Sequence, residues 1–203
     1  MARTKQVPQQ KENISSRIST LFLFTAIPMP VVRAILEQEG KPSRRERKLP
    51  ADVLVMLIIF MAIYPDYNTR GVFEAMYSDI FPGLIPDKCA NVGEVAISQA
   101  RQRLGDKVME SLFDAVCRPM AGRDTRGAWY REWRLMAVDG SVVNLPDERK
   151  ILEEYPKHPT GKGEFAFPQL RYAALMEVGS RAYTKVAIGS DSDSEMSLAA
   201  KVE

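Results

Sequence analysis

The spacing of apolar residues changes once along the chain, from a helical period in the first two thirds to extended runs in the last third. We predict helices over 14–27, 31–38, 53–64, 70–80, 92–104 and 107–120. Proline and glycine separate these segments, and Asn68 or Thr69 and then Asp106 are typical N-terminal caps. Gly105 is a typical residue at the end of the helix before it. The pattern predicts a helical region that extends to residue 128.

The most apolar segment, 53–64, raises the question of a membrane span. It has twelve residues, with Asp52 before it and Asp66 after it. A helix needs about 20 apolar residues to cross a bilayer, so we interpret this segment as a buried helix and expect no membrane association.

From Trp133 onward the pattern is that of an antiparallel sheet. The run 134–139 ends at Asp139-Gly140, and 142–145 continues as a second extended piece, which places Asp139 at a strand end. Two further strands, over 170–178 and 181–188, are joined by the hairpin signal Gly179-Ser180. After an excursion loop over 147–167, the stretch Ser192-Asp-Ser-Glu195 matches a capping box that opens a last helix.

These elements predict an α+β fold with two domains. Residues 1–128 form a helical N-terminal domain, and residues 129–203 hold three antiparallel strands and a helix. A helix that follows a hairpin usually returns the chain to the sheet for another strand. We therefore expect the second domain to be partial in this chain.

The composition is that of a soluble globular protein and narrows the possible chemistry. The 203 residues are 45% apolar and 27% charged, with two cysteines and one histidine. Two cysteines cannot complete a four-thiolate zinc site, and one histidine cannot support a multi-histidine cluster. Chemistry must rest on carboxylates, on hydroxyls or on bases brought in by a partner. The polar start with few cysteines is typical of a cytoplasmic protein.

Basic residues are concentrated in the first quarter of the chain. Residues 1–50 hold ten lysines and arginines against four acids. The densest part contains Arg44, Arg45, Arg47 and Lys48. These side chains could contact phosphates whatever the base sequence. A solvated loop between helices is the alternative, and this stretch alone favours it.

The predicted helix over 92–104 carries residue types that contact DNA. They are Ser98, Gln99, Arg101, Gln102 and Arg103. Serine and glutamine hydrogen-bond to base edges, and arginine binds phosphates and bases. Val95, Ile97 and Leu104 could pack inward against a core. A solvated helix face is the alternative interpretation.

A second basic cluster combines arginine with aromatic residues. Arg123, Arg126, Arg131 and Arg134 surround Trp129, Tyr130 and Trp133. Arginine interleaved with aromatic rings can hold unstacked bases or a nucleic-acid backbone. A linker that packs on the next domain explains the same residues equally well.

Asp139 is the sharpest candidate for catalytic chemistry. A carboxylate followed by Gly140 at a strand end leaves room for a phosphate or a metal ion, and Mg²⁺ is commonly held by one or two carboxylates. A turn aspartate is the alternative, since Asp-Gly is a favoured hairpin corner. Asp191, Asp193 and Glu195 are better explained as residues near a helix start.

Four motifs, in this order, resemble the N-terminal portion of the bacterial insertion-element-four transposase family. They are the apolar helix after Leu49-Pro50, the stretch Ile97-Ser-Gln-Ala-Arg-Gln-Arg-Leu-Gly105, the stretch Leu135-Met-Ala-Val-Asp-Gly-Ser141 with Leu145-Pro146-Asp147, and Phe167-Pro-Gln-Leu-Arg171 leading to Ser194-Glu195. Each motif is weak alone, but four in order are specific. Members join a helical N-terminal domain to a ribonuclease-H-like catalytic domain with two aspartates and a glutamate.

The resemblance implies that Asp139 is the first catalytic aspartate and a metal ligand. The chemistry it implies is cut-and-paste DNA transposition, in which water and then a DNA 3′ hydroxyl attack phosphodiesters with the help of two Mg²⁺ ions. The second aspartate and the glutamate have no counterpart in this sequence. We therefore expect a truncated transposase that does not cleave DNA by itself.

The resemblance also implies the partners. They are the terminal inverted repeats of an insertion element and, in DNA-bridged multimers, the chain itself or a full-length transposase. Two other interpretations stay open: a non-catalytic DNA-binding regulator that inhibits the full-length transposase, and a decayed gene fragment.

Overall fold

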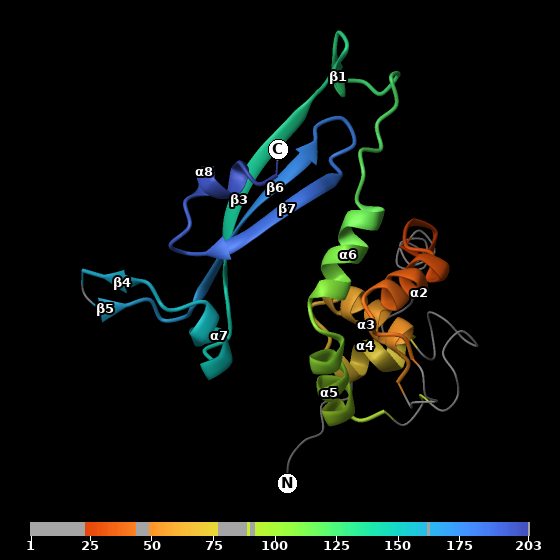
Figure 1. Cartoon of the computed structure of the whole chain (residues 1–203), viewed down its shortest axis with the longest axis vertical. Helices are drawn as coiled ribbons and strands as arrows, with labels where there is room; N and C mark the ends of the chain where they lie inside the picture. The colour runs from red at the N-terminus through yellow and green to blue at the C-terminus, as the bar shows by residue number, and fades with distance from the viewer. Residues whose placement is uncertain (1–22, 44–48, 77–88, 90–91, 162, 203) are drawn as a thin grey trace. The chain divides into compact units, whose positions relative to one another are not determined.

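The computed structural model describes residues 23–43, 49–76, 89, 92–161 and 163–202, and it has the predicted α+β architecture (Figure 1). The chain divides into two compact units, Met1–Val116 and Cys117–Glu203. This division falls ahead of the domain boundary predicted at residue 128. The described part of unit 1 is helical, and unit 2 is built on an antiparallel sheet.

The core of unit 1 surrounds its most apolar helix. The helices are α2 (Met29–Gln38), α3 (Ala51–Ile63), α4 (Thr69–Ala75), α5 (Glu94–Leu104) and α6 (Lys107–Val116). Helix α3 packs against α2, α4 and α5, and α6 packs against α2. An ion pair of 2.9 Å between Arg33 and Asp52 also joins α2 to α3.

The prediction that the segment around α3 is a buried helix is confirmed. Val55 and Leu57 are completely buried, and Phe60 on the next turn is 1% exposed. Pro50 precedes the first turn, where a proline costs no helical hydrogen bond. Among the described helices, none is long and apolar enough to cross a membrane.

Three predicted helix boundaries are also confirmed. Asn68, and not Thr69, caps α4, because its Oδ1 accepts a hydrogen bond of 2.7 Å from the Gly71 N–H. Gly105 follows α5 with a φ of 76°, a conformation that glycine adopts without strain. At the start of α6, Asp106 Oδ1 accepts from the Lys107 N–H at 2.8 Å.

The prediction that the last helix of unit 1 reaches residue 120 is wrong, because α6 ends at Val116. Pro119 disfavours helical backbone at the residue before it. The backbone N–H groups of Met120 and Ala121 donate instead to Glu177 Oε2, each at 2.8 Å. These residues therefore pack with the sheet, which explains why unit 2 begins at Cys117.

The main sheet of unit 2 has three antiparallel strands, as predicted. They are β3 (Met136–Asn144), β6 (Gln169–Glu177) and β7 (Tyr183–Ser190), in the order β3-β6-β7. The two extended pieces predicted around Asp139-Gly140 are one continuous strand, because Asp139 pairs with Ala174 and Gly140 with Ala173. The prediction that Asp139 ends a strand is therefore wrong.

Helix α8 (Glu195–Ala199) covers one face of this sheet (Figure 1). Leu198 and Val202 are buried against Ala173 and Ala187 of the central and edge strands. The cap of α8 is Ser194 and not the predicted Ser192, since Ser194 Oγ accepts from the Ser197 N–H at 3.0 Å. The Ser192 hydroxyl instead contacts Ser190 Oγ at 2.6 Å.

Smaller elements lie at both ends of the sheet (Figure 1). The strands β1 (Trp129–Tyr130) and β2 (Trp133–Arg134) form a short hairpin ahead of β3. Helix α7 (Arg149–Glu154) and the strands β4 (Pro159–Thr160) and β5 (Gly163–Glu164) occupy the segment predicted as an excursion loop.

Candidate functional site

The predicted DNA-contacting residues of α5 share one exposed face. The buried side chains of this helix are Ile97, Ala100 and Leu104. At about 100° per residue, Ser98, Gln99 and Gln102 lie on the opposite side, and all three are exposed. The structure thus brings these three predicted residues together as one uncharged stripe that can donate and accept hydrogen bonds.

Val95 lies in the same stripe, and the prediction that it packs inward is wrong. Its side chain is 72% exposed, whereas Ile97 is buried. Residues two apart on a helix do not face the same side, so only one of these two could reach the core. That spacing was the available signal for Val95, which we add to the site. We define the stripe as Val95, Ser98, Gln99 and Gln102.

Two exposed arginines border the stripe on opposite sides. The helical rotation places Arg101 on one flank and Arg103 on the other. Among the described residues, neither guanidinium forms an ion pair. Lys41 Nζ donates to the Arg103 carbonyl at 3.0 Å, which holds another positive charge at the C-terminal end of α5.

The next basic residue, Lys107, is already paired. Its ammonium contacts Glu110 Oε2 at 2.9 Å. This hydrogen bond, with the charge of the same carboxylate, raises the pKa of Lys107 above its ordinary value. Lys107 is therefore charged at neutral pH, but its charge is directed to Glu110.

A shallow groove runs along the Arg101 flank of α5. It is lined by Met61, Pro65, Tyr67, Asn68, Thr69, Glu94, Ile97, Ser98 and Arg101. The groove joins the end of α3 and the start of α4 to the predicted site, a relationship that the sequence pattern did not indicate. Because Ser98 and Arg101 belong to both surfaces, a ligand along α5 would also meet this loop.

The basic segment of the sequence analysis is not placed. Arg44, Arg45, Arg47 and Lys48 lie outside the described residues. Their assignment to phosphate contacts remains a prediction.

Asp139 lies within the edge strand β3, with an exposed side chain. Its Oδ1 accepts a hydrogen bond of 2.9 Å from the Gly140 N–H. Gly140 faces α8, since an added Cβ there would lie 2.9 Å from Glu195 Cγ. Side chains alternate along a strand, so Asp139 faces the other side of the sheet, away from Glu195.

The described residues do not fit a site for two Mg²⁺ ions. They contain no group of three or more histidine, cysteine, aspartate or glutamate side chains that could hold a metal. Two other acids near the sheet have partners of their own. Asp191 accepts from Arg171 at 3.1 Å and lies 3.3 Å from His158, and Asp193 accepts from the Ser190 N–H at 2.8 Å. Asp139 alone cannot provide the second ion with ligands.

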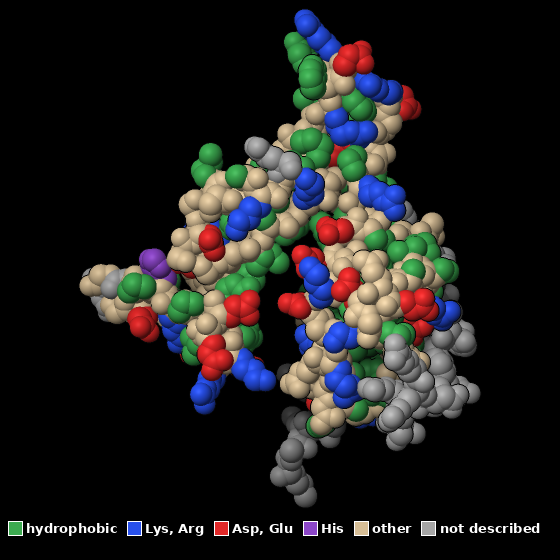
Figure 2. All heavy atoms as spheres, viewed as in Figure 1, with side chains coloured by type: hydrophobic (Ala, Val, Ile, Leu, Met, Phe, Trp, Pro, Cys, Tyr) green, Lys and Arg blue, Asp and Glu red, His purple; other side chains and the backbone are tan. Residues whose placement is uncertain are grey.

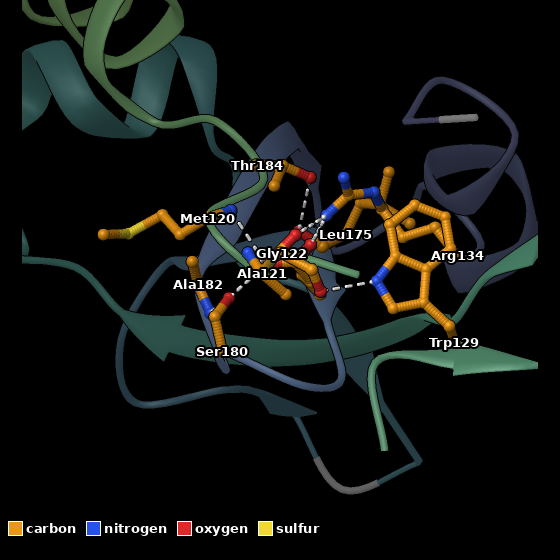
Figure 3. A network of polar contacts seen from close by, with 10 residues as sticks. Met120, Ala121, Gly122, Trp129, Arg134, Leu175, Ser180, Ala182 and Thr184 are labelled. Carbon is orange, nitrogen blue, oxygen red and sulfur yellow. Dashed lines mark hydrogen bonds and ion pairs between the residues drawn. The ribbon is translucent and has the colours of Figure 1, made fainter. Parts of the chain in front are cut away.

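Two members of the arginine and aromatic cluster of the sequence analysis, Trp129 and Arg134, belong to a network of polar contacts (Figure 3). The carboxylate of Glu177 is completely buried and accepts hydrogen bonds from Arg134 and the Ser180 hydroxyl. Arg134 also donates to the Ala121 carbonyl at 3.1 Å, and Trp129 Nε1 donates to the Gly122 carbonyl at 2.8 Å. The base of the β1–β2 hairpin is thereby fixed to the sheet.

The sequence of the helical unit matches a family of mobile-element proteins. Residues 17–114 match the family described as Insertion element 4 transposase N-terminal. The match covers 98 of the 203 residues, all of them in unit 1, so this unit is similar to the N-terminal domain of insertion element 4 transposases.

Two curated relatives from Escherichia coli (strain K12) extend the similarity into unit 2. Transposase InsG for insertion sequence element IS4 is 25% identical over 169 residues, which cover 83% of this chain and 37% of that protein. Putative transposase InsZ is 28% identical over 156 residues, covering 76% of this chain and 49% of that protein. The chain thus spans less than half the length of these relatives. No solved structure matches it.

Proposed function

We propose that this transposase-like chain binds the terminal inverted repeats of an insertion element through α5 of unit 1. The observation that carries this proposal is the exposed stripe of Val95, Ser98, Gln99 and Gln102 between two arginines that have no ion-pair partner among the described residues. Hydrogen-bonding side chains in the centre suit base edges, and arginines on the flanks suit the two phosphate backbones.

The dimensions of α5 support this mode of binding. From Val95 to Gln102 the helix rises about 10 Å, which corresponds to about three base-pair steps of 3.4 Å. The major groove, about 12 Å wide, admits a single α-helix. Val95 offers an apolar contact of the kind that a thymine methyl group accepts.

The test is equilibrium binding of the full chain to two labelled duplexes by fluorescence anisotropy. One duplex carries the terminal inverted repeat that flanks the coding region, and the other has the same bases in scrambled order. We expect tighter binding to the repeat, with affinity that falls steeply between about 50 and 200 mM salt. The double variant Gln99→Ala/Gln102→Ala should lose about 1–3 kcal/mol of this preference for each lost base contact.

Gln38→Ala is the matched control, because Gln38 is an exposed glutamine on α2, outside the stripe. It should retain the wild-type preference. An unchanged preference in the double variant, or no preference at any salt concentration, would refute the role of α5. If the wild type shows no preference for the repeat at any salt concentration, the chain is better interpreted as a decayed gene fragment. A clear preference for the repeat supports a DNA-binding protein.

For unit 2, we propose a ribonuclease-H-like origin in which Asp139 corresponds to the first catalytic carboxylate, which would hold Mg²⁺ only together with the further carboxylates of a full-length transposase. The three antiparallel strands followed by a helix support this assignment. We propose three partners: DNA, a second copy of the chain and a full-length transposase. We propose that the chain acts in the cytoplasm. A chain that binds the repeats without cleaving them would act as a regulator of the full-length enzyme.

A further inference from the structure

The β1–β2 hairpin has one face fixed to the protein and one face exposed. The cross-strand pairs are Trp129 with Arg134 and Tyr130 with Trp133. Paired residues lie on the same side of a hairpin, and neighbouring residues lie on opposite sides. Trp129 and Arg134 therefore form the inner face, whereas Tyr130 and Trp133 form the outer face.

The inner face is held by several contacts. The guanidinium of Arg134 lies 4.5 Å from the centre of the Trp129 ring, and that of Arg123 lies 3.9 Å from it. Arg134 is also paired with the buried Glu177. Behind the hairpin, Gly179 approaches the Ala128 backbone so closely that a Cβ there would lie 2.8 Å from Ala128 Cα. These contacts fix the direction in which the outer face points.

The outer face exposes two large aromatic side chains. Trp133 is 75% exposed and Tyr130 is 60% exposed. Between them in sequence, Arg131 occupies the turn with a φ of 54°, which is uncommon for a residue with a side chain. Its guanidinium lies 5.5 Å from the centre of the Tyr130 ring. Strained turn residues of this kind tend to occur at functional sites.

The surroundings of these aromatic residues are basic. Residues 117–135 contain five arginines against the two acids Asp124 and Glu132. Figure 2 shows charged and apolar side chains gathered together at the hairpin end of unit 2. Exposed aromatic rings among arginines are the combination that binds unpaired nucleotides, since rings stack on bases and arginines neutralise phosphates.

We propose that the outer face of the β1–β2 hairpin binds an unpaired DNA base, with Trp133 as the stacking platform and Arg131 as a phosphate contact. Both this proposal and the proposed function concern DNA. They differ in the surface, which is the hairpin here and α5 there, and in the DNA structure, which is unpaired here and duplex there. Binding by the hairpin gives the chain a preference for single-stranded or locally unpaired DNA that α5 would not provide.

The test measures binding of the full chain to three labelled DNAs: a single-stranded oligothymidine, a duplex with one unpaired thymine, and the same duplex fully paired. Trp133→Ala should weaken binding to the first two by about 5- to 150-fold for a lost stacked base. Binding to the paired duplex should change less than about twofold, because the loss of an exposed side chain should leave the fold of the protein intact. Phe167→Ala, which removes another half-exposed aromatic ring, is the matched control and should bind all three like the wild type.

Tryptophan fluorescence gives a second readout that a merely structural role would not change. The chain has two tryptophans, and both lie in the hairpin. Oligothymidine should quench the emission of the wild type and of Trp129→Phe, and should leave the emission of Trp133→Phe unchanged.

Three outcomes would overturn the proposal. They are wild-type affinity of Trp133→Ala for unpaired DNA, quenching that survives in Trp133→Phe, and self-association of the wild type that Trp133→Ala abolishes without any effect on DNA binding. The Gln99→Ala/Gln102→Ala variant separates this proposal from the proposed function, because it should lose recognition of the repeat and keep the preference for unpaired DNA.

Discussion

The carboxylate of Glu177, completely buried at the end of β6, forms an ion pair with Arg134 of β2. It also accepts hydrogen bonds from the Met120 and Ala121 backbone N–H groups. A single carboxylate therefore joins the segment after α6 and the β1–β2 hairpin to the sheet. Removing one member of a buried pair costs much more than the pair contributes, because the other charge is left without a partner.

Glu177→Gln is expected to destabilise unit 2 by about 1.5–3 kcal/mol, since Arg134 loses its counterion but remains 30% exposed to solvent. Urea unfolding followed by tryptophan emission measures this effect for unit 2 alone, because both tryptophans lie there. Glu164→Gln, at an exposed glutamate of β5, should shift the unfolding free energy by no more than about 0.5 kcal/mol. Equal stability of the two variants would contradict the structural role of Glu177.

Gly179→Ala is expected to destabilise the same unit by about 1–3 kcal/mol through overpacking. The added methyl group would contact the Ala128 backbone, which cannot move aside without displacing the hairpin. Gly161→Ala is the control, since nothing lies within 4 Å of a Cβ at that position. The same urea titration compares the variants, and a Gly179→Ala protein as stable as the wild type would show that the contact is not tight in solution.

Arg101→Gln and Arg103→Gln are each expected to reduce the salt dependence of duplex binding by about one unit in the slope of log K against log salt. The reason is that each arginine releases counterions when it contacts a phosphate. Anisotropy titrations at several salt concentrations measure the slope. Arg70→Gln, at an exposed arginine paired with Glu74 on α4, should leave it unchanged. Slopes that fall equally in all three variants would indicate that the total positive charge of the protein, and not α5 in particular, determines the salt dependence of binding.

Asn68→Ala is expected to destabilise α4 by about 1 kcal/mol, because the Gly71 N–H loses its acceptor. Asn68→Ser retains an acceptor at this position and should recover most of the loss. Thermal unfolding followed by circular dichroism compares the three proteins. If serine and alanine were equally destabilising, the side chain of Asn68 would act through the adjacent groove and not as a cap.

Asp139→Asn is expected to have no effect on DNA cleavage, because we predict that the wild-type chain does not cleave insertion-element ends in the presence of Mg²⁺. Asp139 has no acidic cluster around it among the described residues. Gel assays with Mg²⁺, and with Mg²⁺ removed by a chelator, provide the measurement. A cleavage product that depends on Mg²⁺ and disappears in Asp139→Asn would refute the prediction.

Several boundaries could be predicted because they depend on residues close in sequence. Asn68 caps the helix that follows it, and Gly105 ends the helix before it, through contacts within one turn. The end of α6 could not be predicted in this way. Met120 and Ala121 leave the helix for Glu177, which lies more than 50 residues further along the chain. A local pattern contains no information about such a distant acceptor.

The candidate site was also predicted in part from the sequence. The residue types of α5 indicated a DNA-contacting surface, and the structure places Ser98, Gln99 and Gln102 on one exposed face. The sequence analysis did not assign Val95 to this face, although its spacing of two residues from Ile97 excludes that both side chains face the core. Asp139 was singled out by the Asp-Gly pattern and by the resemblance to a family motif, but its place within a continuous strand depends on pairing with β6.

The sequence by itself determined the order of the main helices and of the three long strands, the buried helix α3 and the resemblance to a transposase family, since these follow from local periodicity and from motifs in order. The tertiary structure decided which side of each element meets solvent. Burial depends on neighbours brought together from distant parts of the chain, as Glu177 is with Arg134 and Ala121. In the same way, the exposure of Trp133 and Val95 depends on how the chain packs around each of them.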